Sequence, residues 1–212
     1  MQIQTQVGPV ASTTSIAAGT TVVARSGQLG DLISSELHGR YYEQSYRRNI
    51  FNAANQTGIV TTNTLAAAAY TGLMLSNPVG STINVVVNKA GFGFNVLWPN
   101  ASIIALLCGY NSSTNVTHTV AGTPRSNFFG VGSAGQALVD TSSTTPSASV
   151  ITHILGVGST GALTTEMAYG PTIVDLEGSL VLPPGAWTGF YTSAVSGAAG
   201  GFFSFQWEEV PV

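Results

Sequence analysis

A strict alternation of aromatic and polar residues runs through Phe203-Ser204-Phe205-Gln206-Trp207-Glu208, close to the last residue of this 212-residue chain. A period of two places the three rings on one face of a β-strand and the polar side chains on the other. Further upstream, Pro183-Pro184-Gly185 separates two apolar runs, residues 179–182 and 186–191. Proline cannot donate a ladder hydrogen bond and glycine tolerates positive φ, so this tripeptide predicts a turn between two strands. We therefore expect the last forty or so residues to supply strands to a sheet and to close its core.

Short apolar segments punctuated by Gly, Pro and Asn fill the chain from residue 64 to these strands. Turn signals stand at Asn77-Pro78-Val79-Gly80, Trp98-Pro99-Asn100, Thr123-Pro124 and Gly170-Pro171. The candidate strands are residues 65–75, 83–87, 92–98, 103–108, 116–120, 126–129, 136–139, 149–155, 162–168 and 172–176. No segment has the period of a long helix. We therefore predict an all-β fold, in which residues 64–212 form an antiparallel β-sandwich that is jelly-roll-like in its connections.

Formal charges are scarce in this chain. Charged residues make up 7% of it and hydrophobic residues 44%, whereas an ordinary soluble domain has about 25% charged residues. So few charges leave little solvated surface for an isolated subunit, and we expect the chain to assemble with other copies. The longest apolar run, residues 103–108, is far shorter than the roughly 18 residues of a membrane-spanning helix, so no membrane is expected as a partner. The net charge of −3 gives no overall attraction to nucleic acid, so nucleic acid is not expected as a partner.

Residues 1–28 are predicted to form an extended N-terminal arm, because they have no core-forming period and no charge before Arg25. The β-branched run Thr20-Thr21-Val22-Val23 favours a strand that adds to a neighbouring subunit. The first residues lack the basic and continuous apolar regions of a secretory signal. Cys108 is the single cysteine, so no internal disulfide is possible. Both observations fit synthesis in a reducing cytosol.

A charged, tyrosine-rich segment follows the arm. Of the six basic and nine acidic residues in the chain, seven lie between positions 25 and 48. The candidate contact residues are Arg40, Tyr41, Tyr42, Tyr46, Arg47 and Arg48. Arginine pairs with phosphate and tyrosine stacks on bases, which suits nucleic acid, but the same types are enriched at protein interfaces. The interspersed acids Asp31, Glu36 and Glu43 favour the protein interface. We interpret residues 29–63 as an interface segment, with a short helical turn capped by Asp31 and ended by Gly39.

Two glycine-rich loops, Gly130-Val131-Gly132-Ser133-Ala134-Gly135 and Gly156-Val157-Gly158-Ser159-Thr160-Gly161, spell G-x-G-x-x-G. This dinucleotide fingerprint works only where the loop opens a helix whose N-terminal amides hold the pyrophosphate. No helical segment follows either loop. We therefore interpret both loops as connections between strands and expect no cofactor.

The sequence contains no recognisable catalytic or metal-binding set. The histidines, His38, His118 and His153, are not spaced to share a metal with a second ligand. The loop around Ser159 is not a nucleophile elbow, because no strand-to-helix turn follows it. Cys108 lies in an apolar run and is expected to be a buried, inert thiol. The acid pairs Asp175/Glu177 and Glu208/Glu209 are expected on solvated sheet faces. We therefore predict that the chain is not an enzyme and has no catalytic, cofactor-binding or metal residue.

Several stretches resemble structural proteins of tailed-bacteriophage virions. They are Gly30-Asp31-Leu32-Ile33-Ser34-Ser35-Glu36-Leu37-His38-Gly39-Arg40-Tyr41-Tyr42-Glu43-Gln44, Tyr70-Thr71-Gly72-Leu73-Met74-Leu75-Ser76-Asn77-Pro78, Leu182-Pro183-Pro184-Gly185-Ala186-Trp187 and Phe205-Gln206-Trp207-Glu208-Glu209. Such proteins include capsid decoration or cement proteins, which have β-sandwich folds and are often trimeric. The resemblance implies a cement subunit that stabilises the phage head through its arm and sandwich. Its expected partners are itself, as a homotrimer, and the major capsid protein, and its expected location is the virion, assembled in the host cytoplasm.

The alternative is a receptor- or glycan-binding head domain of a tail fibre. In that case Trp98, Trp187, Tyr110 and Asn111 are expected on exposed loops, where the aromatic rings would stack on sugar. A glycan-binding protein would bind host polysaccharide as a free protein, whereas a cement protein would bind empty capsids.

Overall fold

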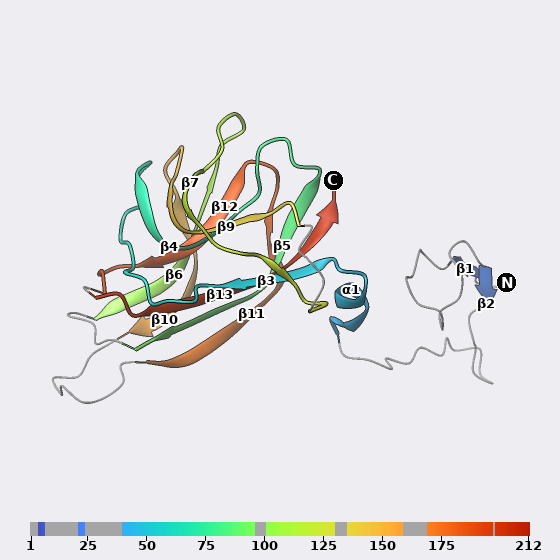
Figure 1. Cartoon of the computed structure of the whole chain (residues 1–212), viewed down its shortest axis with the longest axis horizontal. Helices are drawn as coiled ribbons and strands as arrows, with labels where there is room; N and C mark the ends of the chain where they lie inside the picture. Colours follow the sequence, from blue (N-terminus) through green and yellow to red (C-terminus); the bar gives the residue numbers. More distant parts are fainter. Residues whose placement is uncertain are drawn as a thin grey trace.

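The computed structural model describes residues 4–6, 21–23, 40–95, 101–129, 135–158, 169–196 and 198–212 (Figure 1). One short helix and thirteen strands occur in these ranges. The helix is α1 (Tyr42–Tyr46). The strands are β1 (Gln4–Gln6), β2 (Thr21–Val23), β3 (Ile50–Ala54), β4 (Ala69–Ser76), β5 (Ile83–Phe94), β6 (Ser102–Tyr110), β7 (Thr117–Ala121), β8 (Arg125–Ser126), β9 (Leu138–Thr144), β10 (Val150–Gly158), β11 (Tyr169–Leu182), β12 (Ala186–Thr192) and β13 (Gly201–Pro211).

Two antiparallel sheets pack face to face, which confirms the all-β sandwich. The six-stranded sheet has the order β10-β6-β12-β4-β9-β7, and the five-stranded sheet has the order β11-β5-β13-β3-β8. Consecutive strands from β3 to β6 and from β10 to β13 mostly lie in opposite sheets, so the chain crosses the core repeatedly. The sandwich begins earlier than predicted, because β3, inside the expected interface segment 29–63, is an inner strand paired with β13 and β8. Ile50, Phe51 and Ala53 of β3 are buried, whereas Asn52 and Ala54 are exposed.

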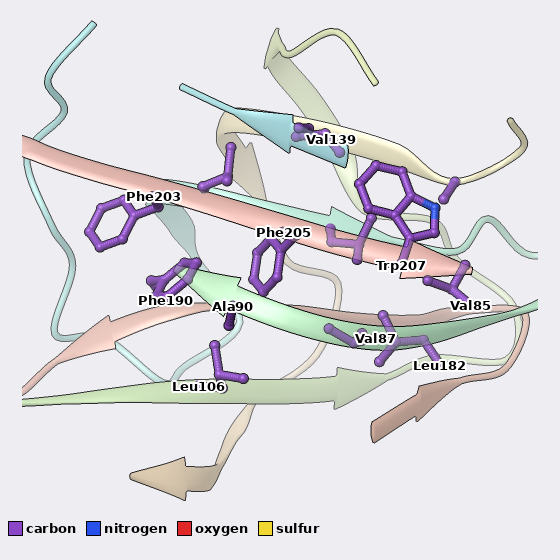
Figure 2. Packing of buried hydrophobic residues seen from close by; sticks show 14 of the residues in the cluster. Val85, Val87, Ala90, Leu106, Val139, Leu182, Phe190, Phe203, Phe205 and Trp207 are labelled. Atoms are coloured by element: carbon purple, nitrogen blue, oxygen red, sulfur yellow. The ribbon is translucent and has the colours of Figure 1, made fainter. Parts of the chain in front are cut away.

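The core between the sheets is built on β13, as the alternation in its sequence predicts. Phe203, Phe205 and Trp207 are buried, whereas Ser204, Gln206 and Glu208 on the other face are partly exposed. Phe190 of β12 stacks on Phe203 with ring centroids 4.5 Å apart and lies 4.8 Å from Phe205, so the cluster joins the two sheets (Figure 2). Each fully buried phenylalanine stabilises the fold by about 1.5–3 kcal/mol relative to an exposed one.

The predicted turn at Pro183-Pro184-Gly185 joins β11 to β12. The amide of Ala186 donates to the carbonyl oxygen of Pro183 at 3.0 Å, and Gly185 has a φ of 88°. A Cβ at this position would lie 2.3 Å from the carbonyl oxygen of Asn111, so both the backbone angle and the space require glycine.

A second, smaller apolar cluster lies on the outer face of the six-stranded sheet. Its buried members are Tyr70, Met74, Leu107, Val116 and Trp187. The partly buried Leu65 and Tyr191 pack against it. Register explains the arrangement: Trp187 of β12 pairs with Gly109 of β6, and the absent side chain of Gly109 leaves room for the indole. The sandwich is therefore covered in part by its own loops on this side.

Two other predictions concern the N-terminal part, of which the structure describes only short segments. In the described part of the arm, β2 pairs with β1 of the same chain, Thr5 lying opposite Val22. The described partner of Thr21–Val23 is thus a strand of the same chain, and pairing with a neighbouring subunit stays a prediction. The helical turn expected at Asp31 lies outside the described residues, and so does most of the arm. No helix in the described ranges is long and apolar enough to span a membrane.

Candidate interaction surface

The structure places five of the six predicted contact residues in two groups. The first is the arm root, Arg40 and Tyr41, which lies against β5 and β11. The Arg40 guanidinium donates to Oε1 of Glu177 at 3.0 Å and lies 4.0 Å from Oδ2 of Asp175. The same guanidinium and the ammonium of Lys89 each lie 5.3 Å from the centroid of the Tyr41 ring. The arm root is therefore bound by both ionic and cation–π contacts.

A bulge in β11 presents the two carboxylates to Arg40. Asp175 pairs with Lys89 of β5, but the next pair is Leu180 with Val87, so residues 176–179 loop out of the ladder. Within the bulge, Glu177 has a φ of 50°, and its amide donates to Oδ1 of Asp175 at 3.0 Å. The two acids therefore form an internal ion-pair site for the arm root and not simply a solvated sheet face.

Burial and charge perturb the groups of the arm root in defined directions. Burial raises the pKa of the Tyr41 hydroxyl, and the nearby Asp175 carboxylate raises it further, while Arg40 lowers it. The hydrogen bond that Arg40 donates to Glu177 raises the pKa of Arg40, so this side chain stays charged at any ordinary pH. Because Arg40 and Glu177 are more than half exposed, solvent screens their attraction. Their ion pair orients the chain at the arm root more than it stabilises the fold.

The second group is an aromatic–arginine surface made by α1, the turn after it and the loop after β8. It consists of Tyr42, Tyr46, Arg48, Phe128 and Phe129. The rings of Tyr42 and Tyr46 stack at 6.0 Å, and Tyr46 meets Phe128 edge-on at the same distance. The Arg48 guanidinium lies 5.4 Å from the centroid of the Phe128 ring. Tyr42 is 45% exposed and Phe129 is 90% exposed, so the surface combines ordered aromatic residues with an unusually exposed one.

Backbone hydrogen bonds hold this surface on the sandwich. The amide of Asn49 donates to the carbonyl of Gln44 at the end of α1, and the amide of Glu209 in β13 donates to the carbonyl of Asn49 at 2.9 Å. On the other side, the amide of Asn127 donates to the carbonyl of Ile50 in β3. Arg48 has a φ of 66°, which is uncommon for a residue with a side chain. The chain thus adopts a costly backbone angle here, as is typical of functional surfaces.

Arg47, the remaining predicted contact residue, is half-buried beside this surface. The sequence reasoning missed Phe128 and Phe129, because it interpreted residues 126–129 as a strand. In the structure β8 stops at Ser126, and the two phenylalanines follow it in a loop. The signal was present in the sequence: two consecutive aromatic residues cannot both face a core from one strand.

The other chemically notable residues form internal contacts. His118 Nδ1 is hydrogen-bonded to Oδ2 of Asp140, which is fully buried. His153 contacts its neighbour Thr152, and His38 lies outside the described residues. No group of three or more His, Cys, Asp or Glu residues within the described ranges is placed to hold a metal ion.

Three smaller predictions differ in part from the structure. The Glu209 carboxylate accepts hydrogen bonds from the amides of Gln136 and Ala137, at 2.9 and 3.0 Å, so it anchors a loop and is not part of a solvated acid pair. Cys108 is half-buried, and burial raises the pKa of its thiol. Gly156 and Gly158 belong to the strand β10, while the other glycine-rich loop lies outside the described residues except for Gly135.

Comparisons of this chain with protein families, with curated proteins and with solved structures find no match.

Proposed function

We propose that this chain is a structural protein of a tailed-bacteriophage virion, a capsid decoration or cement subunit. The observation that carries the proposal is the aromatic–arginine surface, held rigidly at one end of the sandwich and adjacent in sequence to the arm root. Tyrosine, phenylalanine and arginine are enriched at protein contacts, where they supply most of the binding energy. On this proposal the surface and the arm bind the major capsid protein, and the subunits form a homotrimer in the virion.

The strand order supports the jelly-roll part of the proposal. If β7, β8 and β9 are treated as an insertion between β6 and β10, each sheet keeps four strands, β10-β6-β12-β4 and β11-β5-β13-β3. Two four-stranded sheets between which the chain repeatedly crosses are typical of a jelly roll, a fold that occurs in viral capsid proteins and also in lectin domains. This argument is an analogy between folds, so the function depends on the surface described above.

The tail-fibre alternative loses one of its predicted sugar-stacking residues. Trp187 is 1% exposed, and its indole nitrogen donates to Ser149 at 3.1 Å inside the smaller apolar cluster. The amide oxygen of Asn111 accepts from the amides of Ser113 and Thr114 in its own turn. Tyr110 is 56% exposed beside a cavity of about 400 Å³ and is the feature that still favours this candidate. Trp98 lies outside the described residues.

Co-sedimentation with empty phage heads tests the proposed function. Phe129→Ala removes the most exposed aromatic ring of the surface, and we expect it to weaken head binding at least tenfold, the effect of losing about 1.4 kcal/mol at an interface hot spot. Phe202→Ala, which removes a partly exposed phenylalanine from β13, is the matched control and should bind normally. Equal binding by both variants and the parent chain would show that the surface is not the head-binding site, and capture on immobilised host polysaccharide would favour the tail-fibre alternative.

A further inference from the structure

The described formal charges are segregated to one side of the molecule. Eleven formally charged residues lie in the described ranges, and ten of them belong to α1, its flanking turns or the five-stranded sheet. These ten are Arg40, Glu43, Arg47, Arg48, Lys89, Arg125, Asp175, Glu177, Glu208 and Glu209. The eleventh, Asp140, lies in the six-stranded sheet with a fully buried side chain. The described outer face of the six-stranded sheet therefore presents no Asp, Glu, Lys or Arg side chain to solvent.

Part of this charge-free face is strongly apolar. Ile151, Ile154 and Val157 of β10 lie opposite Leu107, Ala105 and Ile103 of β6, respectively. Strand alternation puts these residues on the outer face, because the intervening Ile104 and Leu106 belong to the core between the sheets. Ile103, Ile151, Ile154 and Val157, the isoleucine–valine stripe, are between 41% and 70% exposed. The stripe continues from the smaller apolar cluster, which contains Leu107, but unlike that cluster it is not buried.

The chemistry of the stripe restricts what can cover it. Nucleic acid and anionic lipid need basic residues, and a partner surface with exposed charges would lose their hydration against the stripe without gaining an opposite charge. A complementary surface is flat, apolar and free of charge. The same face of another copy of this chain has these properties, and in a closed cyclic oligomer the residues nearest the symmetry axis are the same in every subunit, so this face can meet its own copies there.

The irregularity of β10 favours association through the outer face of the six-stranded sheet over the addition of another strand along the free edge of β10. This strand is at the end of its sheet, and its register with β6 shifts between Ile151 and His153 and again between Ile154 and Gly156. Such bulges disrupt the even row of amide and carbonyl groups that an added strand requires, and proteins use them to prevent edge-to-edge pairing. The outward side chains are unaffected and can pack on a second sheet at the usual separation of about 10 Å.

We propose that copies of this chain associate through the isoleucine–valine stripe, so that the outer faces of their six-stranded sheets meet at the symmetry axis and the charged faces point away from it. The inference rests on the self-association in the proposed function and adds the surface responsible for it. In this arrangement, the aromatic–arginine surface and the arm root, both on the charged side, are left accessible to other partners.

Two matched substitutions test the stripe. Ile154→Lys places a charge in the stripe, whereas Ile173→Lys makes the same change on β11 of the other sheet, and the two isoleucines are 70% and 72% exposed. In light scattering across a range of concentrations, the parent chain and Ile173→Lys are expected to have a mass several times the 21.8 kDa of one chain. Ile154→Lys is expected to have the mass of one chain, with an unchanged far-UV circular dichroism spectrum.

Three results would overturn the inference: a parent chain that is a monomer, an Ile154→Lys variant that keeps the parent mass, or equal dissociation of both lysine variants. A photoreactive p-benzoylphenylalanine at position 154 of the full chain gives a second readout. Cross-linking to a second copy supports the inference, and cross-linking only within the chain, only to a head protein or to nothing contradicts it. Head binding is measured separately. An oligomer that depends on the stripe but does not bind heads would refute the cement function without contradicting the proposed interface.

Discussion

Asp140 is the one described charged residue of the six-stranded sheet, and its environment is unusual for a carboxyl group. The side chain is fully buried in β9, Oδ2 is hydrogen-bonded to His118 and Oδ1 has no hydrogen-bond partner. Burial raises the pKa of Asp140 above its ordinary value of 3.8, and the contact with His118 offsets only part of this effect. The buried carboxylate therefore costs stability whenever it is ionised.

The sign of this effect gives a prediction for the pH dependence of stability. A raised pKa means that the folded chain binds the proton more tightly than the unfolded chain, so the contribution of Asp140 is greatest below pH 3.8 and is lost as the pH rises through its raised pKa. Each unit of the shift corresponds to about 1.4 kcal/mol. We expect Asp140→Asn to remove this dependence, so that the free energy of unfolding of the variant increases relative to that of the parent chain between pH 4 and pH 7.

Urea denaturation at a series of pH values measures this difference. Glu208→Gln is a useful comparison, since burial also raises the pKa of Glu208 in β13 of the other sheet, so a change of the same sign is expected. If the difference between Asp140→Asn and the parent chain stays constant with pH, the pKa of Asp140 is the same in the folded and unfolded chains, and the assigned cost is wrong.

At the level of single residues, sequence predicts burial better than it predicts partners. The alternation of Phe203, Phe205 and Trp207 identified three core residues, because period and hydrophobicity act locally. The burial of Trp187 was missed, because it depends on Gly109 lying opposite it on another strand. Likewise, the pairing of Arg40 with Glu177 joins residues 137 positions apart, and no local pattern records such a contact.

Among the elements, the arm is the one whose function is separable from the fold. Its root is bound by the bulge of β11, and the sandwich proper begins at β3. Deleting residues 1–28 is expected to leave far-UV circular dichroism and thermal unfolding of the sandwich unchanged, because the described core clusters are built from residues between Phe51 and Trp207. We expect head binding and head stability to fall sharply.

Co-sedimentation of the truncated chain with heads tests whether the arm takes part in head binding. Arg40→Ala in the full chain is the comparison, because it loosens the arm root without removing the arm. Undiminished head binding after truncation would show that the arm takes no part in the contact and would leave the aromatic–arginine surface as the site. A truncated chain with a lowered melting temperature would instead mean that the arm contributes to the stability of the sandwich.

The sequence predicted the existence of most strands better than it predicted where each strand begins and ends. Turn residues correctly separated β4 from β5, β5 from β6 and β11 from β12, because Pro and Gly favour turns. The turn predicted at Gly170-Pro171 was wrong, since both residues lie inside β11, and the break predicted between residues 87 and 92 is absent, since β5 runs from Ile83 to Phe94. β3 was missed because its run Ile50–Ala54 is short and follows directly on the charged segment. The order of the strands in each sheet depends on contacts between distant segments, and neither turn chemistry nor alternation specifies it.

At the scale of the whole molecule, both sheets share one core, so they should unfold together. Phe205 of the five-stranded sheet packs on Phe190 of the six-stranded sheet, and the larger core cluster takes its residues from both sheets. Phe205→Ala is expected to lower the free energy of unfolding by about 3–5 kcal/mol, the usual cost of emptying a buried aromatic site. Tryptophan fluorescence and far-UV circular dichroism should still give coincident urea transitions.

Phe202→Ala, at a partly exposed position of the same strand, should cost no more than about 1 kcal/mol. If tryptophan fluorescence and far-UV circular dichroism give different urea midpoints for the Phe205→Ala variant, the two sheets unfold as independent units, contrary to the shared core.

The central place of β13 in the five-stranded sheet has a consequence for biosynthesis. β13 lies between β5 and β3 in the sheet. The contacts of β13 span most of the chain: the amide of Phe203 donates a hydrogen bond to Oδ1 of Asn55, just after β3 and 148 positions earlier in the sequence. While the ribosome is still translating the segments before β13, both neighbouring strands have emerged without the partner that fills the space between them. The nascent chain therefore cannot complete its sheet step by step, and productive folding waits until β13 leaves the exit tunnel. Until then, two unpaired strand edges are open to other nascent chains on the same message, a hazard that chaperone binding during translation would limit.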